Sequence, residues 1–122
     1  MKVQKFVKMK ISRFEDIIAW QKAKLLTKNI YLLFGDSKDY SFKDQIQKAS
    51  CSIMNNIAEG FERKTNNEFK YFLFIAKGSC GEVRSMLCLA FELNKIKESD
   101  YKEQYALCEE ISKMLSGLIK TL

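Results

Sequence analysis

Apolar residues recur at spacings of three and four along most of the chain, which is the period of an amphipathic helix. Short polar stretches divide this pattern into four segments. The pattern predicts helices over residues 13–34, 42–60, 66–94 and 99–121. Because short connections join consecutive segments, we expect an all-α, single-domain protein, folded as an antiparallel four-helix bundle.

Capping signals support these boundaries. Ser12 and Glu15 have the spacing of a capping box before the first apolar run, and Thr65 and Glu68 repeat it before the third. Ser41 is a weaker candidate cap for the second helix, and Gly35 is expected to end the first.

Two of the predicted helices carry a second apolar face besides the one that fills the core. A lone four-helix bundle has little use for this surface, so we expect it to form an oligomer interface. The residues assigned to that interface are Phe14, Ile18, Leu25 and Leu32 in the first helix and Tyr71, Phe74 and Gly78 in the third.

The second helix has an apolar seam that includes the amide of Asn56 and ends at Gly60. A buried Asn must be hydrogen-bonded, and a Gly lets another backbone come close. Glu59 stands four residues before Arg63 and is expected to pair with it. We therefore assign structural roles to Asn56, Glu59 and Gly60, and keep a ligand or ion cluster as the alternative.

The composition fits a helical domain and offers little catalytic chemistry. The 122 residues include no proline, no histidine, five glycines and four cysteines. No cysteine pair has metal-ligand spacing, and no nucleophile–base, zinc-protease or phosphate-loop motif is present. We expect no enzymatic activity, no metal, no cofactor and no small-molecule substrate. The sequence shows neither a signal peptide nor a membrane span, which predicts a cytoplasmic protein.

The formal charge of +6 is concentrated at the N-terminus. Residues 1–13 form a basic arm without acidic residues, whereas the bundle domain, residues 14–122, is close to neutral. Acid-free arms of this kind contact nucleic-acid backbones. A short strand added to a neighbouring chain and a frayed tail are the alternatives. The candidate binding residues in the arm are Lys2, Lys5, Lys8 and Lys10.

A second cationic feature lies along the third predicted helix. Lys70, Lys77 and Arg84 recur every seven residues, so they lie on one edge, about 10 Å apart at the helical rise. None has an acidic residue three or four positions away, and Lys95 continues the line. Such a row suits phosphate contact, which is electrostatic and independent of sequence. The alternative is a solvated edge or a subunit contact.

Three blocks carry a family resemblance: residues 14–23, 45–63 and 72–79. They resemble the bacterial "four helix bundle protein" family, which was first described as proteins encoded in intervening sequences of large-subunit ribosomal RNA genes. The accessory protein of diversity-generating retroelements is similar. The chain departs from the family at Met54-Asn55, where Pro-Ser is usual, and at Lys77, where Arg is usual. It also lacks the proline of the first loop.

The resemblance implies a four-helix bundle that assembles into a ring-like pentamer, without known catalytic activity and with suspected nucleic-acid association. Two hypotheses follow. The chain is an oligomeric accessory factor that binds RNA or DNA through phosphates, or it is an oligomeric scaffold whose partner is another protein. Salt-dependent binding to nucleic acid distinguishes them.

Overall fold

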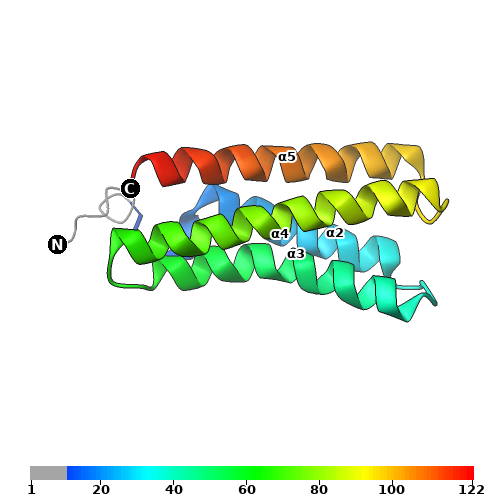
Figure 1. Ribbon diagram of the computed structural model, residues 1–122, viewed down its shortest axis with the longest axis horizontal. Helices are drawn as coiled ribbons and strands as arrows, with labels where there is room; N and C mark the ends of the chain where they lie inside the picture. Colours follow the sequence, from blue (N-terminus) through cyan, green and yellow to red (C-terminus); the bar gives the residue numbers. More distant parts are fainter. Residues whose placement is uncertain (1–10) are drawn as a thin grey trace.

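The computed structural model describes residues 11–122, which form four long helices and one short 3-10 helix. The 3-10 helix η1 (Phe14–Asp16) precedes α2 (Ile18–Phe34), and α3 (Tyr40–Phe61), α4 (Asn66–Glu92) and α5 (Glu98–Lys120) follow. The described part of the chain contains no strand. Figure 1 shows the long helices side by side along one axis. The all-α, four-helix-bundle prediction is confirmed.

The helices pack in a closed order around the core. α2 contacts α3, α3 contacts α4, α4 contacts α5, and α5 contacts α2. This order places α2 and α4 on a diagonal of the bundle. The inward positions are aliphatic, aromatic or small, and Leu26, Ile53, Leu73 and Ile111 are fully buried. Because α2 and α4 lie on a diagonal, the outward-facing residues of these two helices point to opposite sides of the molecule.

The start of the first helix differs from the prediction. Ser12 does not cap it: η1 forms first, the backbone is extended at Ile17, and α2 begins at Ile18 without a side-chain cap. The extended residue lets the Ile17 side chain enter the core, where it is 2% exposed. Burial of this side chain outweighs the capping signal of Ser12 and Glu15.

The caps of the next two helices give one correction and one confirmation. Asp39, rather than Ser41, caps α3, because its carboxylate accepts a hydrogen bond from the Phe42 amide at 3.2 Å. The capping box of α4 is present as predicted. The Glu68 amide donates to Thr65 Oγ1 at 3.1 Å, and the Thr65 amide donates to Glu68 Oε1 at 3.3 Å.

The connection between α4 and α5 comprises residues 93–97 and is one residue longer than the predicted connection, residues 95–98. α4 ends at Glu92, and Asn94 adopts a left-handed conformation with φ of 58°. Asn tolerates this region better than most residues. α5 then begins at Glu98, preceded by Lys97 without a side-chain cap. None of the described helices has an apolar stretch long enough to cross a membrane.

Candidate functional site

The three regularly spaced cations of α4, which we call the cationic row, consist of Lys70, Lys77 and Arg84. All three side chains are half-buried along the edge of α4. Lys77 lies against α5, where its ammonium donates to Ser116 Oγ at 2.8 Å and more weakly to Ser112 Oγ at 3.4 Å. Both partners are neutral hydroxyls, so they orient the ammonium without cancelling its charge.

Arg84 occupies the next position along the same seam. Its guanidinium carbon lies 5.7 Å from the centre of the Tyr105 ring of α5, a cation–π arrangement. Its Nε is buried, and no described group accepts a hydrogen bond from it. A buried donor without an acceptor is uncommon in proteins. The side chain is thus held by an aromatic ring rather than by a carboxylate.

No carboxylate among residues 11–122 lies within ion-pair distance of the cationic row. Lys95 differs from the row. It lies beyond the end of α4, 3.2 Å from Asp39 Oδ2 and over the ring of Phe42, and so ties the two helix ends together. The arm candidates Lys2, Lys5, Lys8 and Lys10 lie outside the described residues.

The second apolar faces are exposed on the subunit. On α2, Ile18, Leu25 and Leu32 are exposed, Leu32 most of all at 71%. On α4, Tyr71 and Phe74 are 62% and 56% exposed. Phe14 differs, because its ring packs edge-on against Trp20 at 5.2 Å and the side chain is half-buried.

The two glycines within α4 are not required by packing inside the described subunit. A Cβ added at Gly78 or at Gly81 would meet nothing within 4 Å. Each glycine in a helix interior costs about 1 kcal/mol relative to alanine. Nothing within the described subunit offsets this cost at Gly78, which lies on the exposed face between Phe74 and Leu89.

The three structural candidates lie in the last two turns of α3. Gly60 is buried, and a Cβ there would approach Phe72 Cβ to 2.8 Å, so the two helices meet closely at this point. Glu59 pairs with Arg63 at 2.8 Å, as expected. Asn56 is half-buried rather than buried, and donates to the carbonyl and hydroxyl oxygens of Ser52 on its own helix at 2.8 and 3.0 Å.

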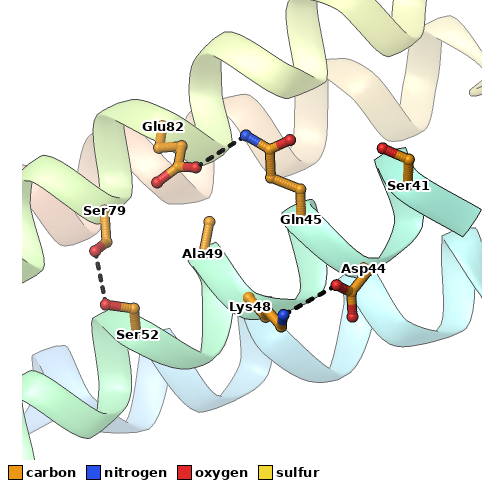
Figure 2. Close-up of a pocket in the computed structure, with 8 residues that line it drawn as sticks. All are labelled: Ser41, Asp44, Gln45, Lys48, Ala49, Ser52, Ser79 and Glu82. Atoms are coloured by element: carbon orange, nitrogen blue, oxygen red, sulfur yellow. Dashed lines mark hydrogen bonds and ion pairs between the residues drawn. The ribbon is translucent and has the colours of Figure 1, made fainter.

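A polar groove of about 460 Å³ runs between α3 and α4. Figure 2 shows two contacts that bridge it: Ser52 and Ser79 share a hydrogen bond of 2.8 Å, and Gln45 donates to Glu82 at 3.4 Å. The sequence pattern did not single out this groove. The sequence feature that could have indicated the groove is the seven-residue spacing of Gln45 and Ser52, which places both residues on one flank of α3. The lining residues are Ser41, Asp44, Gln45, Lys48, Ala49, Ser52, Ser79 and Glu82.

The buried thiols beside the cationic row are not nucleophiles at neutral pH. Burial raises the pKa of Cys80 to about 11, although Arg84 and Lys77 act in the opposite direction. Burial likewise raises the pKa of Cys108. Both thiols therefore stay protonated. Cys80 Sγ donates weakly to the Cys108 carbonyl at 3.5 Å, which is a packing contact.

Comparisons with known proteins agree with the fold. A family model described as "23S rRNA-intervening sequence protein" matches residues 15–117. A solved structure from Bacteroides thetaiotaomicron, described as a protein of unknown function from the S23 ribosomal protein family, superposes with a TM-score of 0.78 at 24% identity. The match covers 84% of this chain and 96% of that one. A search of curated proteins finds no match.

Proposed function

Because the chain belongs to the family of 23S rRNA-intervening sequence proteins, we propose that it is a non-catalytic, oligomeric accessory factor that binds nucleic acid through phosphates. The cationic row of α4 makes the main contacts. The arm lysines Lys2, Lys5, Lys8 and Lys10 assist, and Lys95 has a secondary part because Asp39 already pairs with it.

One observation carries this proposal: the cationic row has no carboxylate partner among the described residues, although the subunit has ion pairs elsewhere. A positive charge that the subunit leaves uncompensated attracts anions. The interval of about 10 Å between members corresponds to about three nucleotide rises of 3.4 Å along one strand. Three phosphates of one strand therefore suit the row.

The exposed apolar faces support the oligomeric part of the proposal. They lie on α2 and α4, which are diagonal in the bundle, and they consist of different residues. A face of one copy therefore meets the other face of the next copy, in a head-to-tail contact. Such contacts close into a ring when the rotation between copies allows it. The family resemblance makes a pentamer the expected ring.

Assembly would also strengthen binding. Every copy brings a formal charge of +6 and one cationic row. A nucleic acid that contacts one row then meets the next at high effective concentration, so avidity raises the apparent affinity.

The four free cysteines are in keeping with a reducing, cytoplasmic location.

The exposed apolar residues favour one second candidate, an oligomeric scaffold whose partner is another protein. Tyr71 and Phe74 are aromatic side chains of the kind enriched in protein interfaces. In this case the cationic row would contact acidic residues of the partner rather than phosphates.

An electrophoretic binding assay with RNA and DNA at two salt concentrations separates the candidates. We expect binding of both nucleic acids at low salt, without base preference, and a steep loss of affinity as salt is added. If the unmodified protein binds neither nucleic acid at low salt, the nucleic-acid proposal is wrong and the scaffold candidate replaces it.

A further inference from the structure

An apolar groove of about 410 Å³ lies between the beginning of α2 and the end of α5. Asp16 is the one charged residue among the described residues that line it. Gly117 leaves it open, because a Cβ added there would meet nothing within 4 Å. The lining residues are Ile11, Asp16, Ile17, Ile18, Ala19, Met114, Gly117, Leu118 and Thr121.

The chain itself enters this groove. Ile11, the first described residue, is half-buried, packs against the core and forms part of the groove wall. Met9 and Val7 precede Ile11 by only two and four positions, so both residues are tethered close to the groove. A segment tethered so closely has an effective concentration in the millimolar range or above, which favours it over a segment from another molecule.

The sequence of the arm matches the groove in pattern. Val7, Met9 and Ile11 alternate with Lys8 and Lys10. In an extended segment, alternate side chains point to opposite sides, so the three apolar residues share one side and the two lysines the other.

The lengths match as well. Residues 7–11 span about 13 Å when extended, at about 3.3 Å per residue. The stretch of α5 that lines the groove, from Met114 to Thr121, rises about 10 Å. Two arm side chains beyond Ile11 are thus enough to cover it.

The charges around the groove do not oppose a basic segment. Asp16 lies in the wall but already pairs with Arg13, 3.5 Å away, and the groove ends at the C-terminal turn of α5, whose unpaired carbonyl groups carry a partial negative charge. Lys8 and Lys10 can therefore face outward without repulsion from the groove and without a partner in its wall. Lys120, in the same turn, is exposed and does not line the groove.

We propose that the arm of the same chain docks in this groove, with Val7 and Met9 inserted beside Ile11 and with Lys8 and Lys10 facing outward. The family model covers residues 15–117. The arm, Leu118 and Thr121 lie outside the matched residues. Docking does not depend on nucleic-acid binding, but it would hold two of the arm lysines at a fixed place on the bundle.

The five methionines of the chain provide the test. Met9 is in the arm, Met114 lines the groove, and Met54 and Met86 pack elsewhere on the core. In the full-length protein labelled with ¹³C at the methionine methyl groups, we expect a nuclear Overhauser effect between Met9 and Met114. The double variant Val7→Gln, Met9→Gln should shift the Met114 resonance and leave those of Met54 and Met86 in place.

The matched control is Lys8→Gln with Lys10→Gln, which changes the outward side of the arm and should leave Met114 unshifted. Gly117→Leu, which fills the groove, should move the methyl resonance of Met9 to the chemical shift that methionine has in an unstructured peptide. A Met114 resonance that is the same in all arm variants overturns the proposal. It is also overturned if unlabelled full-length protein restores the Met114 resonance of the labelled double variant, because the arm then comes from a neighbouring copy.

Discussion

Lys77 on α4 donates a hydrogen bond of 2.8 Å to the hydroxyl oxygen of Ser116 on α5. The contact fixes the position of the ammonium group and leaves its charge uncompensated. The same geometry allows that charge to be cancelled without removal of the lysine.

Ser116→Asp should therefore weaken nucleic-acid binding. The new carboxylate would pair with Lys77 within the subunit and compete with a phosphate for it. We expect the slope of log affinity against log salt to fall by about one, as for the loss of one phosphate contact. The control is Ser99→Asp, at the exposed start of α5, which changes the net charge equally. Equal effects of the two variants would mean that Lys77 has no specific part in binding.

Head-to-tail assembly predicts complementation between two variants that are each defective. Leu25→Asp places a charge on the exposed face of α2, and Phe74→Asp places one on the exposed face of α4. Each variant alone should be monomeric by light scattering, because one of its two faces is blocked. An equimolar mixture should form dimers, since each variant keeps the face that the other has lost.

A mixture that stays monomeric would exclude contact between the α2 and α4 faces. Circular dichroism of each variant provides the control for folding, and both should keep full helix content because the substituted positions are exposed.

Gly60→Ala should lower the free energy of unfolding by about 1–3 kcal/mol, the usual cost of overpacking. The added methyl group would lie 2.8 Å from Phe72 Cβ and 2.9 Å from Phe69 Cδ1. Gly81→Ala is the matched control, because its methyl group meets nothing within 4 Å and it gains helix propensity. Chemical denaturation of both variants checks this contrast, and a Gly60→Ala protein as stable as Gly81→Ala would contradict the close approach of α3 and α4.

The cap of α3 should make stability depend on pH. The hydrogen bond from the Phe42 amide, together with Lys95, lowers the pKa of Asp39 below its usual range. A lowered folded pKa means that the carboxylate stabilises the fold above the unfolded pKa, and that this contribution is lost as pH falls through the folded pKa. Asp39→Asn should therefore destabilise the protein at neutral pH and have much less effect well below pH of about 3.9. Unfolding curves of both proteins at both pH values test this expectation. If the difference in the free energy of unfolding between Asp39→Asn and the unmodified protein is the same at both pH values, the cap is not ionised.

The fold could be predicted from the sequence because local signals and the apolar period agree over most of the chain. Thr65 shows this best: its capping box, read from residue spacing, is present in the structure. Ser12 shows the limit. Its local signal is equally good, but burial of Ile17 decides where α2 begins, and burial depends on contacts far away in the sequence.

The candidate site was predictable only in part. The seven-residue spacing placed Lys70, Lys77 and Arg84 on one edge of a helix, but it could not show which neighbour that edge would face. Ser116 and Tyr105, the contacts that position Lys77 and Arg84, lie on another helix. Lys95 continues the row in sequence, but in the folded chain it pairs with Asp39.

The central claim is that the cationic row binds phosphates, and the salt dependence of binding tests it most directly. The triple variant Lys70→Gln, Lys77→Gln, Arg84→Gln removes the row. A second triple variant, Lys22→Gln, Lys48→Gln, Lys102→Gln, removes the same charge from lysines that already pair with Glu110, Asp44 and Glu98. We predict that loss of the row reduces the salt slope by about three, whereas loss of the paired lysines leaves it nearly unchanged. Equal slopes for the two triple variants would contradict the claim.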